Sequence, residues 1–287
     1  MDRGIANPSL RAAYFAGSIV RGVSLKLGIR THARGWVTLY YHAVTAAERK
    51  EFDMHVKVAA PRAARTSDIG VSGCETGPCV CFTFDDGFAS LLENAIASLV
   101  ARRVPATVFA VSDNLGRKPE WRLAPGDPDA GERVMTAAEL RSLPEDLITI
   151  GSHTATHKRL DELPLDEARI ELTRSKKSLE DVLGRPVTAL AFPHGAYTDE
   201  VVQAAYDAGY RQLFTIEACA HPGPLPMGLI GRFAASPVET ELEFRLKIAG
   251  AYDWLYHVRH TKRRLMDPSE PTRPRKSISV VGVRIDI

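Results

Sequence analysis

Two short stretches hold residues that could carry out chemistry together. The first is segment 81–87, Cys-Phe-Thr-Phe-Asp-Asp-Gly, in which an apolar, β-prone run ends in Asp85, Asp86 and a glycine. Adjacent carboxylates repel each other unless a cation lies between them or one takes up a proton. The second is segment 151–157, Gly-Ser-His-Thr-Ala-Thr-His, whose two histidines can face the same way over one helical turn. One Asp and two His make a three-ligand set with open positions, which is typical of a catalytic metal site.

Together these stretches resemble the first two motifs of the polysaccharide deacetylases, the NodB-homology proteins of carbohydrate esterase family 4. The resemblance covers roughly residues 36 to 235, and only the pair of motifs makes it specific. It implies a distorted (β/α) barrel, with Asp85 as the general base and Asp86, His153 and His157 as ligands of a divalent metal. Zn²⁺ is the expected ion, with Co²⁺, Ni²⁺ or Mn²⁺ as alternatives.

A further histidine, His42, ends the predicted strand 36–42. The string Leu-Tyr-Tyr-His-Ala-Val at 39–44 resembles the L-x-Y-H-x-V opening of a deacetylase subgroup whose motifs are circularly permuted. In that subgroup, the histidine that other members supply late in the chain as general acid comes first. The resemblance therefore implies that His42 is the acid. The region around the end of the barrel has no L-x-L-H string, as permutation predicts.

A loop at 191–197 resembles the third motif of the family, commonly R-x-P-Y-G, with two departures. Ala191 stands where the motif has Arg, and His194 replaces the Tyr. The Arg of the motif orients the catalytic Asp. Here either another cation substitutes for it, and Arg232 is the candidate, or the base is held differently. His194 either touches substrate or is a surface imidazole, and a backbone N–H near it can serve as oxyanion donor. The expected substrate and oxyanion loop comprises Pro193, His194, Gly195 and Tyr197.

Strand and helix patterns alternate through this region, which is typical of a parallel barrel with its active site at the carboxyl ends of the strands. The predicted strands are 36–42, 81–84, 105–111, 147–150, 187–192 and 212–216. The predicted helices are 88–102, 165–183 and 198–208. We expect four segments, which are an N-terminal amphipathic helix at 1–35, the deacetylase domain at 36–236, a C-terminal basic amphipathic helix at 237–266 and a mobile tail at 267–287.

Both terminal helices leave two interpretations open. The helix predicted at 8–30 contains Gly17 and Gly22, and it either packs on the barrel or lies on an anionic membrane surface. The helix predicted at 239–265 ends in basic residues after Trp254 and two tyrosines, which suits either a solvated helix end or a membrane interface. Residues 278–285 alternate enough to form a stray strand.

Composition narrows the functional classes. The chain has 287 residues, 45% of them hydrophobic, which is enough for one barrel domain, and its net charge of +2 gives no support for nucleic-acid binding. The four cysteines lack the paired C-x-x-C repeats of a zinc module, so we expect ordinary thiols in a reducing compartment, with Cys81 packed in a strand. With no signal-peptide pattern and no apolar run of about 20 residues, the expected location is cytoplasmic, with peripheral contact at the inner face of the membrane as an option.

The functional hypothesis is a metal-dependent carbohydrate N-deacetylase, a hydrolase acting on carbon–nitrogen bonds other than peptide bonds. The metal would polarise the acetyl carbonyl and acidify a water, Asp85 would remove the water's proton, and His42 would protonate the leaving amine. The expected substrate is an acetylated glycan or lipid-linked sugar precursor of surface polysaccharide. An O-acetyl esterase using the same residues and a catalytically silent glycan-binding protein are the alternatives. A zincin metalloprotease is not favoured, because that pattern needs Glu after the first histidine and Thr154 stands there.

Overall fold

A computed structural model describes residues 8–26, 35–71, 73–74, 77–121, 123, 127–218, 228–252, 254, 277–280 and 283–286. Cys219 and the basic run at 259–264 lie outside the described residues, as does the start of the predicted tail at 267–276. The domain boundaries expected from the sequence therefore stay predictions.

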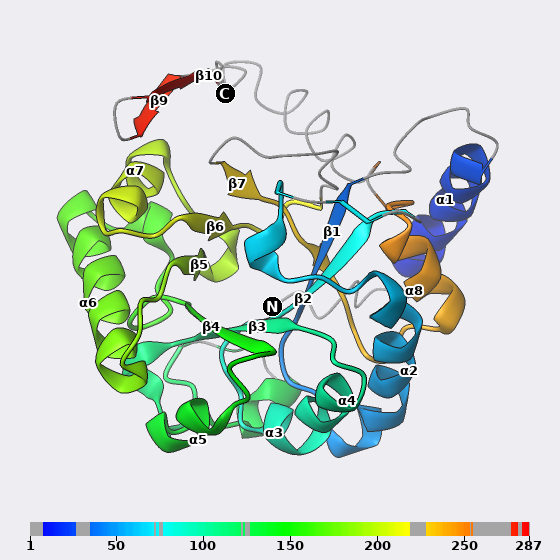
Figure 1. Cartoon of the computed structure of the whole chain (residues 1–287), viewed down its shortest axis with the longest axis horizontal. Coiled ribbons are helices and arrows are strands. Elements are labelled where there is room, and N and C mark those ends of the chain that lie inside the picture. The colour runs from blue at the N-terminus through cyan, green and yellow to red at the C-terminus, as the bar shows by residue number, and fades with distance from the viewer. Residues whose placement is uncertain are drawn as a thin grey trace.

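A curled sheet of eight parallel strands forms the centre of the molecule, with helices around its outside (Figure 1). The strand order is β7-β6-β5-β4-β3-β2-β1-β8. The described strands are β1 (Trp36–Tyr41), β2 (Cys79–Phe84), β3 (Ala106–Ala110), β4 (Ile148–Ser152), β5 (Ala189–Ala191), β6 (Gln212–Phe214), β7 (Leu229–Ile230), β8 (Phe233–Ala234), β9 (Ser277–Val280) and β10 (Val283–Asp286). The last two form a separate antiparallel pair, so the stray strand predicted at 278–285 is divided between two strands.

The helices are α1 (Pro8–Lys26), α2 (Arg49–Ala59), α3 (Ser90–Asn94), α4 (Ile96–Ala101), α5 (Ala137–Ser142), α6 (Leu165–Leu183), α7 (Asp199–Asp207) and α8 (Glu241–Ile248). The β1–β5 strands are buried at nearly every position, because helices cover one face and the barrel interior the other. The predicted (β/α) alternation is confirmed.

The two edge strands of the sheet are consecutive in the chain. β7 ends at Ile230 and pairs with β6, while β8 begins at Phe233 and pairs with β1 at the opposite edge. Three Cα steps span at most about 11 Å, so the two edges must approach each other closely, and Gly231 and Arg232 bridge the seam between them. The result is the distorted (β/α) barrel that the sequence predicts, with Arg232 fully buried at the seam.

The predicted helix 88–102 is wrong as a single element, because it is broken at Ala95 into α3 and α4. Ala95 has φ −121° and ψ −46°, outside the helical range. The preceding residue, Asn94, is buried and donates to the carbonyl of Val44 at 2.8 Å while it accepts from Arg49 at 2.8 Å. These long-range bonds hold the chain at the break, and nothing in the local apolar pattern signals them.

The predicted helix 239–265 also ends early. α8 stops at Ile248, and Gly250 follows in a left-handed conformation with φ 75°, which terminates a helix at little steric cost. Residue 254 is again helical, and residues 255–265 lie outside the described part of the chain.

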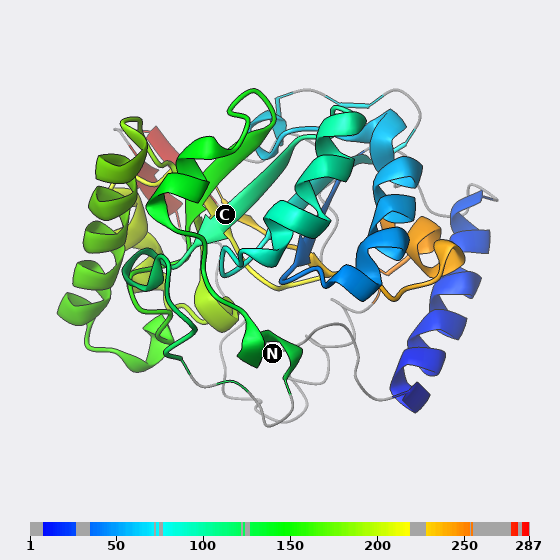
Figure 2. The same cartoon turned by 90° about the horizontal axis from the view of Figure 1, so that it is seen from below.

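α1 packs beside α8 at one end of the molecule in both views (Figure 1, Figure 2). Trp254 donates its indole N–H to Ser18 Oγ at 3.1 Å and meets the ring of Tyr14 edge-on at 5.7 Å between centroids. A Cβ at Gly17 would lie 2.7 Å from the Trp254 ring, and one at Gly22 would lie 2.7 Å from Leu246. The two glycines that weaken the helix therefore permit its close packing, which is the first of the two interpretations left open.

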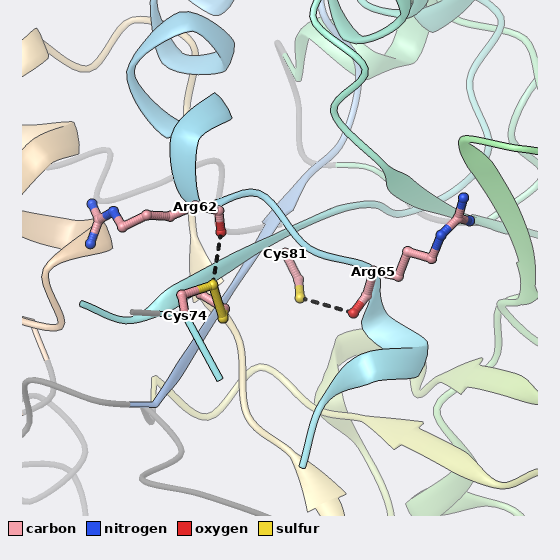
Figure 3. Close-up of a disulfide and its surroundings, with 5 residues drawn as sticks. Arg62, Arg65, Cys74 and Cys81 are labelled. Carbon is pink, nitrogen blue, oxygen red and sulfur yellow. Dashed lines mark hydrogen bonds between the residues drawn. A yellow bond between two sulfur atoms is a disulfide. The ribbon is translucent and has the colours of Figure 1, made fainter. Parts of the chain in front are cut away.

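The expectation of ordinary reduced thiols is wrong for two cysteines. Cys74 and Cys79 form a disulfide with their Cα atoms 5.3 Å apart (Figure 3). Gly77, which lies between them in the chain, has φ 125°, a conformation that favours glycine. Cys81 stays free and buried in β2, as predicted, with its sulfur 3.5 Å from the carbonyl of Arg65 (Figure 3). Since disulfides persist in oxidising compartments, this pair counts against the predicted cytoplasmic location.

Candidate functional site

The chemistry-bearing residues meet at the carboxyl ends of neighbouring strands. His42 follows β1, Asp85 and Asp86 follow β2, and His153 follows β4. All of these except Asp86 line a cavity of about 120 Å³. Its lining residues are Tyr40, His42, Asp85, His153, His157, His194 and Ile216. Parallel barrels place their active sites at this end.

Asp86, His153 and His157 form a buried cluster whose ligand atoms all lie within 4.8 Å of one another. Asp86 Oδ1 is 3.6 Å from His153 Nε2 and 3.2 Å from His157 Nε2. Neither carboxylate oxygen of Asp86 has a hydrogen-bond partner among the described residues. A buried carboxylate without partners is costly, and a cation between these three side chains would remove that cost.

The state of His153 supports a metal ligand. Its Nδ1 lies 2.8 Å from the carbonyl oxygen of Ala191, which can only accept, so Nδ1 carries the proton and Nε2 presents a lone pair toward Asp86. Burial lowers the pKa of His153 to about 4, which keeps the imidazole neutral near pH 7. Two imidazoles and one carboxylate in this arrangement fit a divalent cation such as Zn²⁺.

The conformation that joins the two histidines differs from the predicted helical turn. Residues 153–157 form a loop in which Thr154 has φ 64° and His157 has φ 61°. Asp86 and His194 are also left-handed, with φ 67° and 59°. Four of the five non-glycine residues with positive φ in the described chain thus belong to this site. Backbone strain of this kind gathers where the surrounding structure enforces a functional geometry.

Asp85 is held by a bidentate pair with Arg232. The guanidinium Nη1 and Nη2 lie 2.6 and 2.9 Å from the two carboxylate oxygens. Arg232 also donates to Thr83 Oγ1 at 3.0 Å and to the carbonyl of Thr215 at 3.0 Å. Burial raises the pKa of Asp85, but the charge and hydrogen bonds of Arg232 and the nearby imidazoles of His153 and His42 together outweigh burial and keep this pKa below its ordinary value. The carboxylate is therefore ionised and fixed in orientation.

Three aromatic rings surround the Arg232 guanidinium, with centroids 4.9 Å (Tyr40), 5.4 Å (Phe109) and 5.9 Å (Phe214) from its central carbon. Gly151 makes room for one of them, because a Cβ there would lie 2.5 Å from the Phe109 ring. Arg232, the candidate to substitute for the missing third-motif Arg, thus lies next to Asp85. Its role in orienting the base stays a prediction.

The third-motif loop contributes one side chain to the cavity. His194 lines it, with its ring 4.8 Å from that of His157 and nearly perpendicular to it, and burial lowers the pKa of His194 to about 4. Gly195 is left-handed, and a Cβ there would lie 2.4 Å from Ile216. Pro193 is buried, and Tyr197 instead donates to Glu217 at 3.2 Å, so neither of these predicted loop residues lines the cavity.

His42 is half-buried at the cavity and packs edge-on against Tyr40 at 5.9 Å between ring centroids. Trp121, which the sequence suggests only as a wall of the groove, stacks on the ring of His157 at 4.6 Å. Sequence reasoning missed Ile216 and Glu171. Glu171 could have been noticed, because it is a carboxylate on the buried stripe of an amphipathic helix.

Known proteins are similar to this chain in sequence and in fold. A family model described as polysaccharide deacetylase matches residues 72–213. YxkH of Bacillus subtilis (strain 168), provisionally named as a polysaccharide deacetylase, is 26% identical over 215 residues, which is 69% of this chain and 71% of that protein.

Two solved structures share the barrel. The deacetylase PplD of Streptococcus pyogenes, in complex with acetate, has a TM-score of 0.62 and 18% identity and covers 75% of this chain and 98% of its own. IcaB from Ammonifex degensii has a TM-score of 0.61 and 23% identity, with 76% and 97% covered. The residues matched by the family model contain both the Asp and the His motif, and the chain belongs to the polysaccharide deacetylase family.

Proposed function

We propose that this protein is a metal-dependent hydrolase that removes an N-acetyl group from an acetamido sugar in a glycan. One observation carries the proposal. A carboxylate fixed by Arg232 lies beside a second carboxylate that has no hydrogen-bond partner in the described chain, and two buried imidazoles face that second group. A base and a cation site in one cavity are what hydrolysis of an acyl group requires.

In this proposal Asp86, His153 and His157 hold the divalent ion, with Zn²⁺ as the proposed metal. When bound, such an ion polarises the acyl carbonyl and lowers the pKa of water. Asp85, ionised and oriented by Arg232, accepts the proton of the attacking water. The water oxygen forms a bond to the acyl carbon, the carbon–nitrogen bond breaks, and acetate and the free amine leave.

His42 is the proposed donor of a proton to the leaving amine, because it lines the same cavity and a protonated imidazole can act as a general acid. His194 also lines the cavity and is proposed to contact the substrate, and a backbone N–H near it is proposed to stabilise the oxyanion. An O-acetyl ester would use the same groups, so substrate trials must include both linkages.

The substrate proposed is an acetylated glycan, polymeric or lipid-linked. Exposed Ile19 and Val20 on α1 are compatible with the peripheral membrane contact that the sequence suggests. None of the described helices is long and apolar enough to cross a bilayer. The disulfide favours an oxidising compartment over the cytoplasm as the place of action.

The test combines metal content with product release. Purified protein supplied with Zn²⁺ should hold about one ion per chain and release acetate from N-acetylated glucosamine oligomers or polymers. His153→Ala should lose both. A protein that binds such glycans but neither retains a metal ion nor releases acetate from N- or O-acetylated material would be a silent glycan binder, contrary to the proposal.

A further inference from the structure

Glu171 of α6 is a buried carboxylate that reaches the loop between the two metal-site histidines. Glu171 is only 7% exposed. Oε2 accepts from the backbone N–H of Ala155 at 3.1 Å and of Thr156 at 2.8 Å, and Oε1 accepts from Thr156 Oγ1 at 2.6 Å. One carboxylate thus binds three donors of the segment that joins His153 to His157.

Other groups complete the bonding of this loop. The N–H of His153 donates to the carbonyl of Ala110 at 2.9 Å, that of Thr154 to Ser152 Oγ at 3.2 Å, and that of His157 to Thr154 Oγ1 at 3.2 Å. Every backbone N–H from 153 to 157 therefore has a hydrogen-bond acceptor, and Glu171 is the acceptor for two of these five groups. It is the one charged side chain among these acceptors.

The loop needs such support because two of its residues are left-handed without being glycine. Thr154 and His157 have φ 64° and 61°, where an L-residue is less stable than in the helical or extended regions. A free loop with this sequence would relax toward those regions and turn the imidazoles away from Asp86. Adjacent N–H groups that both point at one carboxylate are compatible with only a narrow set of backbone angles.

We propose that Glu171 is a positioning residue that holds the His153–His157 loop in the conformation that binds the metal. The inference rests on the metal site of the proposed function and adds to it a residue that touches neither substrate nor ion. It acts through the backbone, so its loss lowers metal affinity rather than removing a ligand.

The test measures Zn²⁺ affinity by competition with a chromophoric chelator, on folded protein and without substrate. Glu171→Ala should bind Zn²⁺ at least about tenfold more weakly than the wild type, the range seen when groups behind metal ligands are removed. Glu171→Gln should stay within about threefold, because its amide oxygen can accept both N–H groups and its NH₂ can donate to the Thr156 hydroxyl. Thr156→Val, which removes one of the three donors, should cost about threefold.

Glu180 provides the matched control on the same helix. It also accepts a backbone N–H, that of Val187 at 2.9 Å, but it does not contact the histidine loop. Glu180→Ala should therefore lower thermal stability and leave Zn²⁺ affinity unchanged.

Wild-type Zn²⁺ affinity in Glu171→Ala and Thr156→Val would overturn the proposal, even if both unfold at lower temperature. Equal losses in Glu171→Gln and Glu171→Ala would also overturn it, since the hydrogen bonds would not be the cause. If Glu171→Ala does not fold, the Zn²⁺ affinities of Thr156→Val and Glu171→Gln still test the proposal. A wild type that binds no Zn²⁺ defeats the proposed function together with this inference, whereas normal wild-type binding with unaffected variants defeats this inference alone.

Discussion

Asp85 and Asp86 are neighbours in the chain, yet their surroundings are opposite. Asp85 meets a full guanidinium and has both oxygens paired, so the protein itself neutralises it. Asp86 has no hydrogen-bond partner in the described chain and faces the Nε2 lone pair of a neutral His153. The fold supplies a cation for one carboxylate and leaves room for a cation at the other. The different roles proposed for them therefore rest on the environment and not on residue type.

Exchanging each carboxylate for its amide is the sharpest way to break this comparison. Asp85→Asn should keep Zn²⁺ affinity near that of the wild type while acetate release falls about 10²- to 10⁴-fold, the range for loss of a general base. Asp86→Asn should instead lose most Zn²⁺ binding, measured by chelator competition. Loss of metal in the first variant and retention in the second would reverse the two roles.

Removing the partner of Asp85 should make its environment resemble that of Asp86. Arg232→Leu leaves a buried carboxylate unpaired and should lower the free energy of unfolding by about 3–5 kcal/mol in urea titrations. The control is the partly exposed bidentate pair of Arg102 and Asp53, at 2.7 and 2.8 Å, where Arg102→Leu should cost less than about 1 kcal/mol. Similar losses in the two variants would mean that burial does not separate the pairs.

A buried imidazole outside the site, that of His55, can be compared with the buried imidazole of His153. His55 is buried away from the cavity, and its ring stacks on Phe244. Its Nδ1 lies 3.1 Å from the hydroxyl of Tyr41, and its Nε2 lies 3.2 Å from the carbonyl oxygen of Glu239. Burial lowers the pKa of His55 from 6.5 to about 4. The unfolded chain takes up this proton first as pH falls, so the stabilisation is complete above about pH 6.5 and is lost on acidification toward pH 4.

Between pH 6.5 and pH 4, protonation of His55 should thus lower the free energy of unfolding by about 3 kcal/mol. The measurement is the free energy of unfolding against pH for the wild type and His55→Gln. The variant should have a flatter curve in this interval. Parallel curves would show that His55 is protonated in the folded protein at the same pH as in the unfolded chain.

The smallest effect is expected at the other end of β2 from Asp85. Reducing the Cys74–Cys79 disulfide, which closes a loop with a sequence separation of 5, should lower the free energy of unfolding by about 2 kcal/mol. Acetate release should be unaffected, because the strand lies between the disulfide and the catalytic end. A Cys74→Ser/Cys79→Ser variant should show no response to reductant. If reductant lowers the stability of that variant equally, the disulfide is not the cause.

The site residues that the sequence predicts best are those within short motifs. Asp85, Asp86, His153 and His157 could be found because each pair is local and its chemistry is unusual. Arg232 could be nominated only because a motif Arg is missing, since 147 residues separate it from Asp85 and no local pattern joins them.

Features that depend on tertiary contacts could not be predicted. The left-handed loop at 153–157 requires acceptors from α6, and the apparent helical spacing of its histidines is misleading. The break at Ala95 depends on bonds from Asn94 to distant residues. The disulfide depends on a turn whose geometry the C-x4-C spacing leaves undetermined.

The seam of the barrel also affects the order in which parts of the protein can fold. During synthesis the Asp85 carboxylate emerges 147 residues before the guanidinium that neutralises it. That guanidinium arrives only when β8 pairs with β1, the last strand of the barrel with its first. Such long-range pairing is a slow step of folding. Closure of the barrel and pairing of Asp85 with Arg232 are therefore one event, so a chain with an open barrel lacks the ion pair that orients the proposed base.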